Sequence, residues 1–125
     1  MASEAILFSI DSDRFHGTLR NRGWGFWTEE TALNYLSAER QAIYDIGLPV
    51  KDLMILFDAY DFKVQKQDVI RLLTKPSNPL YNCKRGAFVT PKGLGMMQIR
   101  RGNPHPHIGV FETQSEAWAF IRGGL

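Results

Sequence analysis

Two carboxylates, Asp58 and Asp61, are the residues of this chain whose position most suggests chemistry. They follow an unbroken apolar run, 53–57. Such a run predicts a strand buried on both faces, as in a parallel sheet, and binding sites collect at the carboxyl ends of such strands. Asp58 could act there as a general base or a ligand contact, or it could accept backbone amides as aspartate commonly does. The sequence favours the second role, because no catalytic set accompanies the pair.

Histidine and cysteine offer two further kinds of chemistry. His105 and His107 alternate between prolines and could contribute to a metal site, but a usable site normally needs a third ligand. Cys83 lies beside Lys84 and Arg85, which could lower its thiol pKa. A rigid surface loop and a packed cysteine are the favoured interpretations. The sequence therefore predicts a non-enzymatic protein with no metal and no cofactor.

An apolar group in two distant segments could hold a small ligand. Residues 90–95 place glycines after a predicted strand, where free amides could bind an anion, but the spacing is not that of a phosphate loop. The large apolar side chains of the two segments would line a groove for a lipid or an acyl anion if they are exposed. If they are buried, they belong to the core. The predicted ligand contacts are Trp24, Met96 and Met97 for the wall, and Lys92 and Arg100 for the headgroup.

The element predicted most clearly is a long amphipathic helix over residues 29–46. Thr28 is suited to the N-cap, and Glu29 and Glu30 favour the positive end of the helix dipole. Apolar residues recur at helical spacing, and Gly47 followed by Pro49 ends the helix.

The rest of the chain alternates strands with shorter helices. Strands are predicted at 5–10, 14–20, 53–58, 86–90 and 108–111, with a polar turn at 11–13 joining the first two as a hairpin. Helices are predicted after the loop 60–65, within 91–101 and from 113 onward, where Thr113 and Glu116 have capping-box spacing. This order predicts a single α/β domain with a mixed, mainly parallel sheet.

Composition limits the classes of partner. The chain has 125 residues, 44% of them hydrophobic, which suits one globular core. A net charge of +2 is too small to argue for nucleic acid. No apolar run is long enough to span a membrane, and the N-terminus does not resemble a signal peptide. We expect a cytoplasmic protein that is not transmembrane, and a single cysteine fits that expectation.

Several of these segments together resemble the STAS domain, in particular the SpoIIAA-like group that includes bacterial STAS/Sec14-like proteins. The segments that carry the resemblance are Gly25–Trp27, Leu53–Asp58, Lys84–Val89, Met97–Arg101, Val110–Thr113 and Glu116–Trp118. The resemblance implies a four- to five-stranded sheet with about four helices mainly on one face. It also implies either switched binding of regulatory proteins or docking of lipids and other small ligands, and a homodimer is possible.

The residue that would make a phosphorylation switch is missing. STAS regulators of that kind carry a serine at the start of the helix after the Asp-containing strand, but no serine or threonine lies between Asp58 and Thr74. Asp68 could imitate a phosphate, although its interaction with the helix dipole is the plainer explanation. The leading hypothesis is therefore a module that docks a regulatory protein partner without this switch. Its predicted contacts are Asp58, Asp61, Lys63, Gln67 and Asp68. Small-ligand binding is the alternative.

Overall fold

The computed structural model describes residues 6–103 and 105–123. Their strands are β1 (Phe8–Asp13), β2 (Thr18–Gly23), β3 (Met54–Asp58), β4 (Arg85–Val89) and β5 (Ile108–Phe111). The helices are α1 (Glu29–Ile46), α2 (Gln67–Leu73), α3 (Pro79–Asn82), α4 (Leu94–Arg101) and α5 (Gln114–Ile121), and a 3₁₀ turn spans Val50–Asp52. The α/β prediction is confirmed.

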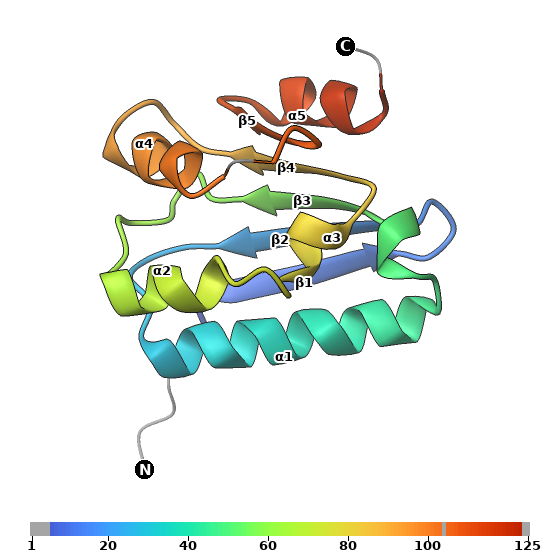
Figure 1. The fold of residues 1–125 in the computed structure, drawn as a ribbon, viewed down its shortest axis with the longest axis horizontal. Helices are drawn as coiled ribbons and strands as arrows, with labels where there is room; N and C mark the ends of the chain where they lie inside the picture. The colour runs from blue at the N-terminus through green and yellow to red at the C-terminus, as the bar shows by residue number, and fades with distance from the viewer. Residues whose placement is uncertain (1–5, 104, 124–125) are drawn as a thin grey trace.

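The sheet runs in chain order, β1-β2-β3-β4-β5, with β1 antiparallel to β2 and the other neighbours parallel. The three connections between parallel neighbours, from β2 to β3, β3 to β4 and β4 to β5, all move in the same direction across the sheet. Because such connections are normally right-handed, their helices lie on one face of the sheet. Figure 1 shows α1, α2 and α3 in front of the sheet, and Ile99 of α4 packs into the core of the same face. α5 follows the last strand and covers β3, β4 and β5 from behind.

Helix α1 has the bounds that its sequence predicts. Thr28 is the N-cap, and its hydroxyl oxygen accepts from the Thr31 amide at 3.1 Å. Gly47 ends the helix at φ 78°, a left-handed conformation that glycine adopts without a steric cost. The apolar stripe of α1, including Ala32 and Ile43, is buried against the sheet. Local capping and helical periodicity therefore agree with the tertiary packing.

The first hairpin lies three residues later than predicted. β1 extends to Asp13 through the segment 11–13 that was expected to be a turn, and the turn occupies 14–17. The error arose because charged residues were taken as a turn signal. Asp11 and Asp13 lie in β1 on the face of the strand that no helix covers, and Asp11 is paired with Arg20 of β2. Phe15, expected in a strand, is at the hairpin tip and 92% exposed. The expected strand start at residue 5 lies outside the described residues.

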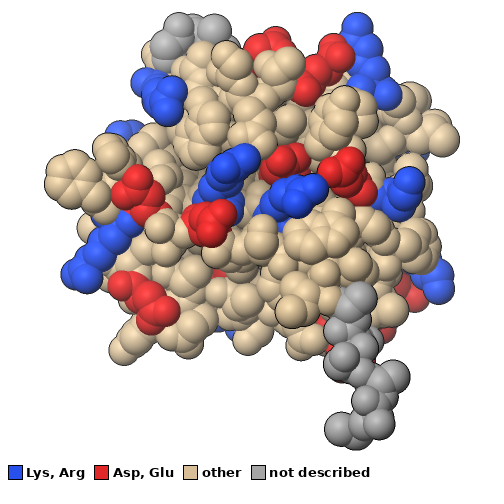
Figure 2. Space-filling model, turned by 180° about the vertical axis from the view of Figure 1, so that it is seen from behind, with Lys and Arg blue, Asp and Glu red and all other residues tan. Residues whose placement is uncertain are grey.

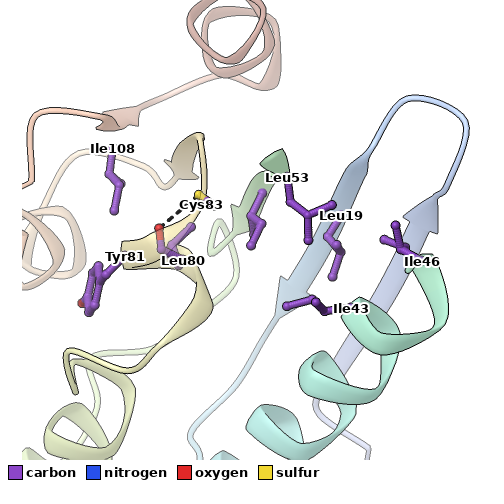
Figure 3. Close-up of a cluster of buried hydrophobic side chains, with 9 residues drawn as sticks. Leu19, Ile43, Ile46, Leu53, Leu80, Tyr81, Cys83 and Ile108 are labelled. Carbon is purple, nitrogen blue, oxygen red and sulfur yellow. Dashed lines mark hydrogen bonds between the residues drawn. The ribbon is translucent and has the colours of Figure 1, made fainter. Parts of the chain in front are cut away.

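A short helix, α3, precedes β4 and is not among the elements predicted from the sequence. Asn78 is its N-cap and Pro79 its first residue, a pairing that favours helix initiation. Leu80 of α3 packs over β4, where a Cβ on Gly86 would lie 2.7 Å from Leu80 Cδ1. Figure 3 shows this cluster, in which Leu80 and Cys83 face apolar side chains from β2, α1 and β3.

The face of the sheet opposite α1 is covered in part by α5 and is otherwise exposed to solvent. α5 leaves β1 and β2 uncovered, so their outward residues are polar. Figure 2 shows this side of the molecule, where positive and negative side chains are interspersed. An open groove of about 530 Å³ beside α5 carries both Asp11 and Arg20, which are cross-strand neighbours. This mixture of charges is typical of a solvated surface.

Candidate functional site

Asp58 is a structural residue at the end of β3. It is buried, with Oδ1 accepting from the Tyr60 amide at 3.0 Å and Oδ2 accepting from Gln114 Nε2 at 2.8 Å. These bonds fix the turn after β3 and tie it to the first residue of α5. Both carboxylate oxygens are therefore committed to hydrogen bonds within the fold.

The other predicted docking residues lie on the surface near this turn. Asp61 forms an exposed ion pair with Arg22 at 2.9 Å. Lys63 is exposed on the same loop, whereas Gln67 and Asp68 lie in the first turn of α2. Asp68 is paired with Arg71 at 2.8 Å. The structure therefore places Asp61 and Lys63 on one loop and separates both from the buried Asp58 carboxylate.

Two loops at the carboxyl edge of the sheet are hydrogen-bonded side by side. The Gly25 amide donates to Asp61 O at 3.0 Å, and the Lys63 amide donates to Gly25 O at 3.1 Å. These loops present aromatic and apolar side chains, and Arg22 lies over the Trp24 ring at 4.9 Å. We call this surface the aromatic edge; its members are Arg22, Trp24, Phe26, Tyr60, Asp61 and Val64.

Gln65 joins the two loops to α4. Its side chain is buried, accepts from the Trp27 amide at 2.8 Å and donates to Gly25 O at 3.0 Å. Its backbone forms a reciprocal pair with Gln98 of α4, at 3.3 and 3.2 Å. A single glutamine thus positions three segments, a role that nothing in the local sequence pattern indicates.

A mostly apolar cavity of about 70 Å³ lies beneath α2 and α4, at the carboxyl ends of β3 and β4. We call it the α4 cavity. Its apolar walls come from the sheet and from α1, α2 and α4, and include Phe57, Phe88, Tyr35, Ile70, Leu73 and Ile99. Its polar lining includes Lys63, Thr74, Thr90 and Gln98.

None of the predicted ligand residues lines this cavity. Met96 is buried in another direction, Met97 is 55% exposed, and Trp24 belongs to the aromatic edge. Lys92 reaches Glu112 at 3.5 Å, and Arg100 is exposed. α4 instead turns Gly95, Gln98, Ile99 and Gly102 toward the cavity. Their spacing of three and four residues is the helical face that the sequence could have revealed.

A buried polar cluster of three side chains lies between α1 and β2. Asn21 Nδ2 donates to Tyr35 Oη at 2.9 Å and to Glu39 Oε2 at 2.8 Å, and the Tyr35 hydroxyl donates to Glu39 Oε2 at 3.1 Å. Asn21 and Glu39 are at most 1% exposed. Among the described residues, Asn21 Oδ1 and Glu39 Oε1 have no hydrogen-bond partner. We call this group the Glu39 cluster.

Burial changes the acid-base behaviour of the Glu39 cluster. Loss of solvation raises the pKa of Glu39 to about 7, against the lowering effects of its hydrogen bonds to Tyr35 and Asn21. The same loss of solvation raises the pKa of Tyr35 well above its ordinary value. Glu39 is not among the residues predicted for a site, although it lies four residues from both Tyr35 and Ile43 on the buried stripe of α1.

Cys83 and the histidines of the late loop have structural contacts. The Cys83 thiol donates to Leu80 O at 3.1 Å, and burial raises its pKa to about 12. His105 stacks on Tyr81 with ring centroids 4.6 Å apart, and His107 Nε2 lies 3.0 Å from Tyr81 O. Within 6–103 and 105–123, no three histidine, cysteine or acidic side chains gather as a metal site.

In the same two ranges, no helix has the length and apolar character needed to cross a membrane.

Comparison with known proteins identifies the fold. No protein-family model matches the chain, and no curated protein matches it significantly. A solved structure is similar over 97% of this chain and 98% of its own, with a TM-score of 0.66 and 18% sequence identity. That structure is of an uncharacterized protein from the DUF3478 family, with a SpoIIAA-like fold, from Shewanella loihica PV-4. The chain therefore has the SpoIIAA-like fold that the resemblance implied.

Proposed function

We propose that this protein binds a small amphipathic anion, with the aliphatic part of the ligand in the α4 cavity. The observation that supports this proposal most is the position of an apolar cavity at the carboxyl ends of two parallel strands. Ligands of open α/β sheets bind beyond these strand ends. Apolar walls with a few polar groups are also the usual composition of a small-molecule site.

The size of the cavity limits the aliphatic part. At about 70 Å³ it has roughly half the volume of the ~150 Å³ cavity that accommodates benzene. The enclosed part of the ligand is therefore about two or three carbons of an unbranched chain, and the rest of a longer tail, such as that of hexanoate, extends toward the mouth. Burial of such a chain contributes about 0.8 kcal/mol per methylene, so a few carbons give weak but measurable affinity.

Lys63 determines the charge of the ligand in this proposal. Lys63 is one of the residues that line the cavity and is also exposed, which is the position expected at a mouth. Among the described residues, no carboxylate lies within 4.0 Å of its ammonium group. Gln98 can donate a further hydrogen bond from the same lining. A short-chain carboxylic acid anion matches the Lys63 ammonium group and the Gln98 amide at the mouth of the apolar α4 cavity.

Titration with sodium hexanoate, followed by amide NMR spectra, tests this proposal. Gly95 lines the cavity, and a Cβ there would meet only Thr90 Oγ1, at 3.8 Å. Gly95→Leu therefore places a side chain where the ligand would lie, whereas Met97→Leu changes an exposed position of the same helix. We expect saturable shifts in wild type and Met97→Leu, and at least tenfold weaker binding in Gly95→Leu. Equal binding by all three proteins would refute the cavity as the site.

Docking of a protein partner through the aromatic edge is a second candidate function. Its support is the exposure of Phe26, Tyr60 and Val64, at 48%, 54% and 45%, on two loops fixed by hydrogen bonds. Tyrosine, tryptophan and arginine are also the residues enriched at interface hot spots. Asp61 and Lys63 of the original hypothesis belong to these loops, whereas Asp58 does not reach the surface.

A double variant with a matched control tests the docking function. Phe26→Ser with Val64→Ser removes apolar area from the aromatic edge, and Leu33→Ser removes a side chain of 53% exposure from α1. We expect partners captured by wild type to be lost from the double variant and kept by Leu33→Ser. Identical capture by all three proteins would exclude the aromatic edge.

A further inference from the structure

We propose that ligand binding in the α4 cavity is coupled to the uptake of one proton by the Glu39 cluster. This inference rests on the proposed ligand-binding function and adds its regulation. The observation behind it is that one residue, Tyr35, belongs both to the lining of the α4 cavity and to the Glu39 cluster. It gives the protein an affinity that depends on pH near neutrality.

Tyr35 connects the cavity to the buried carboxyl group directly. Tyr35 lines the cavity and packs edge-on against Phe57, another wall residue, at a centroid distance of 5.5 Å. Its hydroxyl donates to Glu39 Oε2 at 3.1 Å. A ligand that fills the cavity therefore lies against Tyr35, whose hydroxyl group hydrogen-bonds the Glu39 carboxyl group.

The two acceptors without a partner in the cluster favour the protonated carboxyl group. Asn21 Oδ1 and Glu39 Oε1 are both acceptors, and neither has a donor among the described residues. A proton on Oε1 converts one of these two acceptors into a donor. A buried acceptor without a partner costs about 1–3 kcal/mol, so the added donor has a favourable environment.

Among the described residues, the charged and titratable groups around Glu39 do not provide a buried countercharge. On α1, Tyr35 is neutral, and Arg40 is exposed and has the smallest effect of those that lower the Glu39 pKa. From β2, Asn21 contributes an amide, and before β4 the neutral thiol of Cys83 lies near enough to be affected by Glu39. Ionised Glu39 is therefore stabilised mainly by the two hydrogen bonds already described, with a smaller effect from the exposed Arg40.

A bound ligand shifts this balance toward the neutral acid. Aliphatic carbon against Tyr35 keeps solvent away from this side of the cluster, and poorer solvation penalises the charged carboxylate. The negative charge of the ligand acts in the same direction. Because linkage is reciprocal, a ligand that favours the protonated form must itself bind more tightly to it. The affinity therefore falls as pH rises through about 7, the pKa of Glu39 in the free protein.

The test measures the Glu39 carboxyl pKa by ¹³C NMR, without and with saturating hexanoate. We expect the ligand to raise this pKa by about 0.5–1 unit, which corresponds to about three- to tenfold tighter binding at pH 5.5 than at pH 8.5. Glu39→Gln, which keeps the shape of the neutral acid, should bind equally at both pH values.

The outcomes separate this inference from the proposed function. Binding with an unchanged Glu39 pKa, or an equal pH dependence in Glu39→Gln, would overturn the proton coupling and leave the ligand site intact. Absence of hexanoate binding at both pH values, in both proteins, would overturn the ligand site and the coupling together. If Glu39→Gln does not fold, the wild-type pKa measurement decides the matter alone.

Discussion

Replacement of Glu39 by glutamine should make the folded protein more stable at neutral and alkaline pH. The wild-type carboxyl group is buried against Asn21 and Tyr35 and must either hold a proton or bear a charge without a buried cation. Glutamine has nearly the same shape, remains neutral at every pH and carries the donor that the cluster lacks. The substitution therefore removes the ionisation and keeps the packing.

The size of the effect follows from the shift in pKa. The pKa of Glu39 rises from 4.5 to about 7 on folding, a difference of about 2.5 units. At 1.36 kcal/mol per unit this corresponds to about 3 kcal/mol. The folded state binds more protons than the unfolded state between these values, so the free energy of unfolding falls as pH rises from 4.5 to about 7. The stabilising contribution of the bound proton is fully present below pH 4.5, and it is lost once the pH has risen above about 7.

Urea unfolding at half-unit steps from pH 4.5 to pH 8.5 measures this effect. We expect the difference in unfolding free energy between Glu39→Gln and wild type to grow by about 3 kcal/mol over the window, a large share of a typical 5–15 kcal/mol total. Asp45→Asn, on the exposed face of α1, is a control that should lack this trend. A pH-independent difference between Glu39→Gln and wild type would refute the buried, protonated carboxyl group.

Three further predictions concern Gln65, Gly95 and Cys83. Gln65→Ala should lower the free energy of unfolding by about 1–3 kcal/mol in urea titrations, because it leaves the buried Trp27 amide without an acceptor; an unchanged midpoint would contradict that role. Gly95→Ala should raise thermal stability by about 0.5–1 kcal/mol, because alanine favours helix and its Cβ has room; a lower melting temperature would show that α4 is tighter than described. Cys83 should resist a thiol-specific reagent at pH 8 until the protein is denatured, since its pKa is about 12; rapid modification of the native chain would contradict its burial.

Elements with local signals at both ends were predictable from the sequence. α1 has an N-cap at Thr28, acidic residues in its first turn and a terminating Gly47, and its bounds are those expected. β5 and the Thr113 cap of α5 have similarly local signals. Alternation of these helices with strands was sufficient to predict a mainly parallel sheet, and the resemblance supplied the fold that the comparison confirms.

Features that depend on tertiary contacts were not predictable in the same way. The polar residues of β1 look like a turn until the uncovered face of the sheet is known. Met96 and Met97 of α4 were predicted to contact a ligand, yet the cavity lies against Gly95, Gln98 and Ile99. Glu39 looks like a surface charge, and only the packing of α1 against β2 shows that it is buried. The candidate site is therefore built from contacts between elements that no single segment of sequence encodes.

The most direct test of the ligand site is a search for intermolecular nuclear Overhauser effects between hexanoate and methyl-labelled protein. We expect contacts from the terminal methyl of hexanoate to Ile70, Leu73 and Ile99, which line the α4 cavity. We expect none to Leu33, which is exposed on α1. Contacts to exposed methyl groups alone, or no contacts at a concentration that saturates the amide shifts, would contradict binding in the α4 cavity.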